Sequence, residues 1–77
     1  MDEIKQYVEN AITDGREVTR HYANRCDYLF IVELDGWISI IDVTGGVYSA
    51  VIQAKDMPHA LEFIVLREPI SVPITIL

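Results

Sequence analysis

Apolar side chains recur at helical spacing in residues 2–13, which predicts an amphipathic helix. Ile4, Tyr7, Val8, Ala11 and Ile12 fall on the i, i+3, i+4, i+7 and i+8 positions of one face. The polar residues of this segment fall on the opposite face, where they meet water. We therefore expect this helix to pack one side against the rest of the chain.

The dipeptide Asp14-Gly15 interrupts this pattern and admits two interpretations. In the first, Gly15 ends the helix, because glycine tolerates the left-handed conformation of a helix C-terminus. In the second, Asp14 and Glu17 form a capping box that opens a second helix. We favour the second helix, ending near Arg25, with a strand over residues 17–23 as the alternative.

The centre of the chain predicts three antiparallel strands. Residues 28–34 and 37–43 are rich in aromatic and β-branched side chains, and Asp35-Gly36 between them favours a tight hairpin turn. Gly45-Gly46 predicts a second tight turn, followed by a strand from residue 47 to about residue 53. Two two-residue turns would make this region a three-stranded meander.

The last third of the chain predicts a helix and then a strand. Asp56 is a good N-cap and Pro58 suits a first helical turn, whereas Pro69 ends the pattern. Residues 70–77 alternate apolar and small polar residues, and Pro73 restricts this strand to an edge or to partial pairing. The expected fold is a single α+β domain over residues 1–77, with element order α(α)βββαβ.

Two-residue turns also predict a register for the meander. Phe30 would oppose Ile41, and Ile41 would oppose Ala50. Leu29, Ile31, Ile38, Ile40 and Val51 then share the back of the sheet with Glu33, Asp42 and Gln53. Because a solvated sheet face is normally polar, this surface needs a cover. Part of the same chain, a second copy and a protein partner all remain open as that cover.

Composition and charge narrow the function classes. The chain has 77 residues, 51% of them hydrophobic, and a formal net charge of −6. Residues 27–77 carry seven acids against two bases, a net −5, which disfavours nucleic acid and favours a protein partner with a basic surface. A single cysteine, an acidic N-terminus and no long apolar run lead us to expect a cytoplasmic protein of a bacterium or an infected host cell, with no membrane contact.

Catalytic and metal-binding patterns are weak. His21, Cys26 and Asp27 are residue types of a cysteine nucleophile set, but their spacing is not diagnostic. We therefore expect no enzyme, no metal and no cofactor. Arg16, Arg20 and Arg25 would form a basic stripe on the second helix, the one candidate anion-binding surface.

The acids of the first hairpin are the favoured interaction site. Glu33, Asp35 and Asp42 lie on or beside this hairpin, and with Ile31, Ile38 and Ile40 they would bind and block a larger, basic-surfaced partner. In size and charge alone the chain resembles inhibitors encoded by mobile elements, such as phage anti-CRISPR and anti-restriction proteins. Antitoxins and immunity proteins look similar, and a homodimeric regulatory or small-ligand-binding domain is the alternative of a different class.

Overall fold

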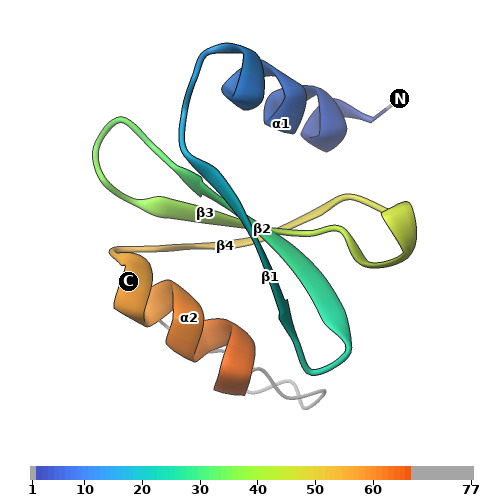
Figure 1. The fold of residues 1–77 in the computed structure, drawn as a ribbon, viewed down its shortest axis with the longest axis vertical. Coiled ribbons are helices and arrows are strands. Elements are labelled where there is room, and N and C mark those ends of the chain that lie inside the picture. The colour runs from blue at the N-terminus through green and yellow to red at the C-terminus, as the bar shows by residue number, and fades with distance from the viewer. Residues whose placement is uncertain (1, 67–77) are drawn as a thin grey trace.

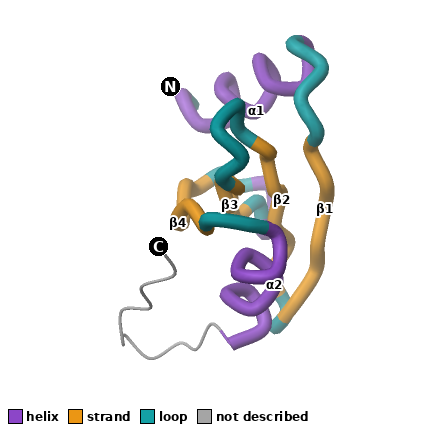
Figure 2. Tube along the Cα trace, turned by 90° about the vertical axis from the view of Figure 1, so that its left-hand side faces the viewer, coloured by secondary structure: helices purple, strands orange, loops and turns teal. Residues whose placement is uncertain are grey.

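The computed structural model describes residues 2–66, which form two helices and a four-stranded antiparallel sheet (Figure 1). In chain order the elements are α1 (Glu3–Thr13), β1 (Val18–Ala23), β2 (Cys26–Val32), β3 (Ile38–Asp42), η1 (Thr44–Gly46), β4 (Ser49–Ala54) and α2 (Met57–Leu66). The strands lie in the order β1-β2-β3-β4, with β1 and β4 at the two edges (Figure 2). The predicted α+β class is confirmed, whereas the strand expected at residues 70–77 lies outside the described residues.

The second helix predicted after Asp14 is wrong, because Gly15 ends α1 and β1 follows. Gly15 has a φ of +79°, its N–H donates to the carbonyl of Ile12, and the N–H of Arg16 donates to the carbonyl of Ala11. These two bonds form a Schellman motif, which satisfies carbonyls that the last helical turn leaves open. The chain then enters the sheet as β1, the alternative that the sequence left open for residues 17–23.

A tight turn at Asn24-Arg25 makes β1 the partner of β2. Ala23 pairs with Cys26, and both turn residues have positive φ, 52° and 66°. Two such residues fit a type I′ turn, whose twist matches the flanking strands. The Asn24 amide also donates to the carbonyls of Ile64 and Val65 at 2.9 Å, which fastens this turn to the end of α2.

The first predicted hairpin has a longer loop than the sequence suggested, and this corrects the register. Phe30 pairs with Ile40 instead of Ile41, so Ile38 and Ile40 share the face of Phe30. Across the second turn the predicted pairing of Ile41 with Ala50 is confirmed. Beyond it, Ile40 pairs with Ile52, so Val51 is an extra residue that forms a bulge in β4.

The two helices cover opposite faces of the sheet (Figure 1). Ala60, Phe63 and Ile64 of α2 pack with Phe30 and Ile40 on one face. On the other face, Val8 and Ala11 of α1 pack with Ile31 and Ile41. The surplus apolar side of the sheet is therefore covered by a helix of the same chain.

Neither helix of residues 2–66 is long and apolar enough to cross a membrane.

Candidate functional site

Glu33 is the centre of a polar cluster between α1 and the sheet. Its carboxylate accepts hydrogen bonds from the Tyr7 hydroxyl and from Arg16 Nη1, the latter at 2.5 Å. Arg16 Nη1 also lies 3.3 Å from the Tyr7 oxygen. The Glu33 side chain is only 12% exposed. Because a buried carboxylate is costly without partners, this arrangement ties the first helix to the loop between β2 and β3.

Ser39 and Gln53 extend this cluster across the sheet. The Ser39 hydroxyl donates to Glu33 Oε2 at 2.5 Å, and the Gln53 amide donates to the Ser39 oxygen at 3.0 Å. Burial raises the pKa of the Tyr7 phenol above its ordinary value of 10.0, and the hydrogen bond to Glu33 raises it further. The Glu33 carboxylate thus accepts from side chains of α1, of the loop that follows α1 and of β3, and Gln53 of β4 joins the cluster through Ser39.

A pocket of about 370 Å³ opens beside this cluster, between the first turns of α1 and strand β4. The side chain of Ala50, on the α1 side of β4, is only a methyl group, and the bulge at Val51 follows it. The space between α1 and this part of β4 is therefore not filled by side chains. Most of the lining is apolar, with a few polar groups, a combination typical of binding sites. Among the lining residues, Glu3, Tyr7, Ser39 and Gln53 supply the polar groups, and the apolar ones include Ile4 and Ala50.

The hairpin residues that were predicted to bind a partner make contacts within the chain: the acids accept hydrogen bonds, and the isoleucines are buried. Asp35 accepts from the backbone N–H of Trp37 at 3.0 Å, and Asp42 accepts from that of Thr44 at 2.9 Å, so both stabilise turns. The predicted isoleucines are buried under the two helices and form no exposed surface. Their exposures are 0% for Ile31, 3% for Ile38 and 1% for Ile40.

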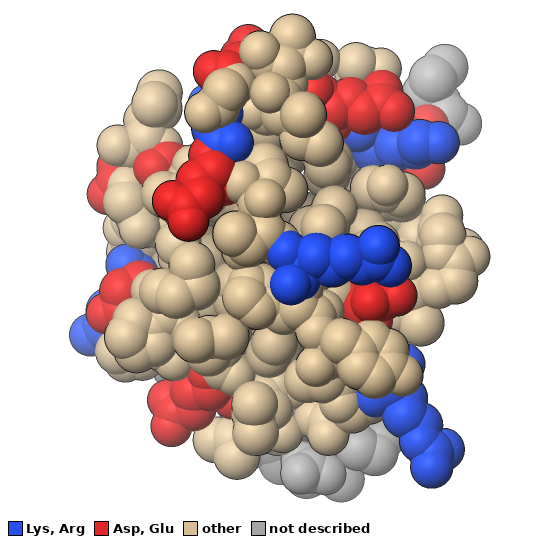
Figure 3. All heavy atoms as spheres, in the orientation of Figure 1, with Lys and Arg blue, Asp and Glu red and all other residues tan. Residues whose placement is uncertain are grey.

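The predicted basic stripe is not formed, because its residues lie on a loop, a strand and a turn instead of one helix. Arg16 pairs with Glu33, and Arg20 pairs with Asp27 at 3.2 Å. Arg25 is exposed in the β1–β2 turn. Blue and red groups lie interspersed in Figure 3, and no broad basic area appears on this face.

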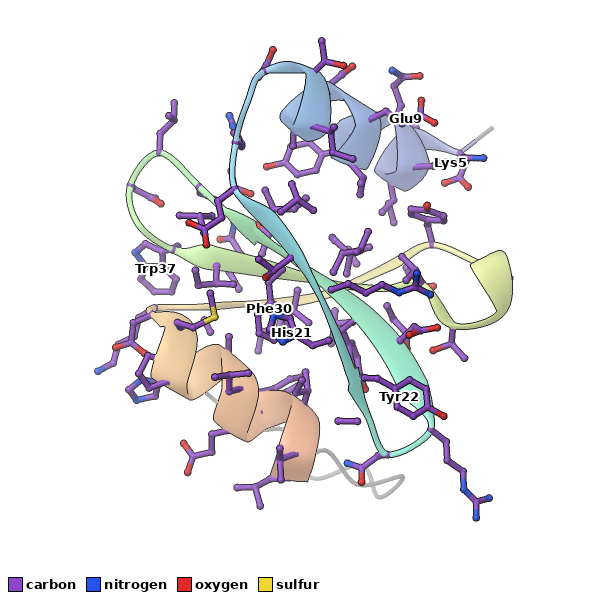
Figure 4. The ribbon with its side chains drawn as sticks, in the orientation of Figure 1. Lys5, Glu9, His21, Tyr22, Phe30 and Trp37 are labelled. Carbon is purple, nitrogen blue, oxygen red and sulfur yellow. The ribbon has the colours of Figure 1, made fainter. Side chains whose placement is uncertain are left out.

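Exposed acids gather instead along α1 and at its two ends, a surface that the hairpin-centred prediction missed. We call this surface the acidic face of α1, and it consists of Asp2, Glu3, Glu9 and Asp14. Figure 3 shows acidic groups around this helix at the top of the view, and Figure 4 shows Glu9 on the side of the helix away from the sheet. None of the four forms an ion pair among residues 2–66. The sequence signal was the net −3 of residues 1–15, four acids against one lysine.

His21 and Cys26 both pack against side chains of the core. The His21 ring lies 4.0 Å from that of Phe30 (Figure 4), and burial lowers the pKa of this imidazole. Cys26 is half-buried against the core below α2. Residues 2–66 contain no group of three His, Cys, Asp or Glu side chains that could hold a metal.

No protein-family model, curated protein or solved structure matches this chain.

Proposed function

We propose that this chain is a protein-binding module that docks on the basic surface of a larger partner through the acidic face of α1. The single observation that carries the proposal is the distribution of charge. Among the hairpin acids, Glu33 pairs with Arg16, and Asp35 and Asp42 accept backbone N–H groups in turns. The side chains of Glu3, Glu9 and Asp14 are exposed and form no ion pair among the described residues. Carboxylates on a rigid helix would steer association with Lys and Arg clusters.

Helix stability does not account for all of these acids. Asp2 caps the helix by accepting from the N–H of Lys5 at 3.1 Å, and an acid in the first turn favours the positive end of the helix dipole. Asp14 lies at the opposite end, where a negative charge is unfavourable by about 0.3–1 kcal/mol and the last turn has no base. A partner that supplies Lys or Arg would turn this cost into a gain.

Steric blocking is the mechanism that suits this surface. In this proposal, binding through the acids of α1 would itself be the activity, without a chemical step. By covering a basic surface that normally contacts nucleic acid or another protein, a module of this size would inhibit its partner. An inhibitor, an antitoxin or an immunity protein that covers a functional surface of its target would act in this way.

Affinity capture with matched baits tests the proposal. The wild-type chain, a Glu62→Lys control and a Glu3→Lys/Glu9→Lys/Asp14→Lys variant are immobilised, and the proteins that each retains are quantified. Glu62 is exposed on α2, so its reversal changes charge away from α1. We expect a stoichiometric partner with a basic surface that the first two baits retain and the third loses. Equal retention by all three baits, or only self-association, would show that the proposal is wrong.

A further inference from the structure

Strand β4 has an outer edge that no other strand of residues 2–66 covers. The strand order places β4 last, so one of its sides carries backbone N–H and C=O groups that β3 does not use. Natural edge strands are usually protected by charged residues or proline. Ser49–Ala54 contains neither, whereas β1 at the opposite edge carries Arg20 and His21. The bulge at Val51 is the only protective device within the strand.

The apolar pocket lies between α1 and strands β3 and β4, so this edge strand forms part of its wall. Ala50 and Gln53 belong to both the strand and the pocket lining, and Tyr7 and Ile4 of α1 form the opposite wall. Side chains of an added strand would alternate between the two faces of the sheet. Every second side chain would therefore point toward α1, and one of them would enter the pocket.

An acid is the one charged group among the described residues that line the pocket. Glu3 lines it, is exposed and forms no ion pair within residues 2–66, and Asp2 precedes it. The ammonium of Lys5 lies 6.0 Å from the ring centre of Tyr48, the residue directly before β4. A Lys or Arg two positions from the apolar side chain of an added strand would lie on the same face and could reach Glu3.

We infer that β4 binds an extended segment of the partner as a fifth strand, with one apolar side chain in the pocket and a neighbouring basic side chain at Glu3. The basic character of the segment rests on the proposed function, whereas the edge and the pocket are independent of it. Main-chain hydrogen bonds would supply affinity, and the pocket would supply specificity for the apolar side chain that it accommodates.

A synthetic peptide tests this inference on the isotope-labelled full chain by NMR. The probe is acetyl-Thr-Lys-Thr-Leu-Thr-Lys-Thr-amide, with leucine and both lysines on one face, and its control carries glutamate in place of lysine. We expect saturable shifts of the Ser49–Ala54 amides with the lysine peptide and slower exchange of the outward-facing ones. The glutamate peptide should bind at least about tenfold more weakly.

Two substitutions in β4 locate the contact. Ala50→Phe fills the pocket from an exposed position, and we expect it to weaken peptide binding about tenfold or more. Ser49→Phe places the same ring on the opposite face of the strand and should leave binding within about twofold. Both positions are exposed, and the amide spectrum of each variant verifies its fold before titration.

Several outcomes would overturn the inference. The first is the absence of saturable β4 shifts at millimolar peptide, and the second is equal binding by wild type and Ala50→Phe. The third is protection of the β4 edge amides in the free chain, whether by residues 67–77 or by a second copy. The proposed function fails separately: if the α1 variant loses the partner while Ala50→Phe retains it, the acidic face stands and strand addition is wrong.

Discussion

The backbone N–H of Glu33 donates to the carbonyl oxygen of Trp37 at 2.8 Å, and this bond sets the face that β3 presents to each helix. It closes a three-residue loop in which Gly36 has a φ of +90°. A two-residue turn would have paired Leu34 with Trp37 instead. Because strand side chains alternate, that shift of one residue would move Ile38 and Ile40 to the other face of the sheet.

Deletion of Leu34 tests this register. Leu34 is 91% exposed, and its removal leaves Asp35-Gly36 as a two-residue turn between the same pair, Glu33 and Trp37. Asp-Gly suits such a turn, so we expect the deletion variant to fold with the Phe30–Ile40 pairing intact. Cross-strand NMR contacts measure the pairing. Loss of the folded spectrum, or a pairing of Phe30 with Ile41, would contradict the account.

The Glu33 cluster should contribute measurably to stability. We expect Glu33→Gln to lower the free energy of unfolding by about 1–3 kcal/mol, because Arg16 loses its carboxylate partner in a partly buried site. Urea denaturation measures this change. Glu9→Gln, an exposed control on α1, should stay within about 0.5 kcal/mol. Similar losses in the two variants would mean that the cluster does not stabilise the fold.

Tyr7 should make the fold sensitive to alkaline pH. Its pKa is raised in the folded chain, chiefly by burial, so the folded state prefers the protonated phenol. This contribution is fully present below pH 10 and is lost as the pH rises through the raised pKa. Stability measured from pH 8 to 11 should fall less in Tyr7→Phe than in wild type. Parallel curves for the two proteins would be the contrary result.

Asp56 should make α2 sensitive to acid. The backbone N–H of His59 donates to Asp56 Oδ1 at 2.9 Å and lowers the pKa of this carboxyl below its ordinary value of 3.8, with the His59 ring adding to the effect. The stabilisation is present above pH 3.8 and is lost as the pH falls through the lowered pKa. Asp56→Ala should therefore destabilise the chain more at pH 7 than at pH 2. An equal loss at both pH values would argue against it.

Local signals explain which elements the sequence could predict. The first helix, the Asp56 cap of α2 and the pairing of Ile41 with Ala50 follow from periodicity, capping and turn residues that act over a few positions. Strand β1 was not favoured, because Asp14 and Glu17 match a capping box that opens a helix, while Gly15 equally matches a helix end. The first hairpin was displaced by one residue, because Asp-Gly suits loops of two and of three residues.

The candidate site depended on contacts that no local pattern contains. Tyr7 meets Glu33 across 26 positions of the chain, and Gln53 reaches Ser39 across 14. From the sequence alone, Glu33 was therefore predicted to bind a partner and not to pair within the chain. The acidic face of α1 was visible only as a local excess of charge, and the pocket depends on a bulge at Val51 that the turn residues do not encode.

The salt dependence of binding tests the central claim most directly. The affinity of the captured partner is measured by calorimetry over rising ionic strength, for wild type and for Glu3→Lys/Glu9→Lys/Asp14→Lys. The account predicts that wild-type binding weakens steadily as salt screens the exposed charges, and that the variant binds at least about tenfold more weakly at low salt. Equal affinities for the two proteins, with no dependence on salt, would contradict it.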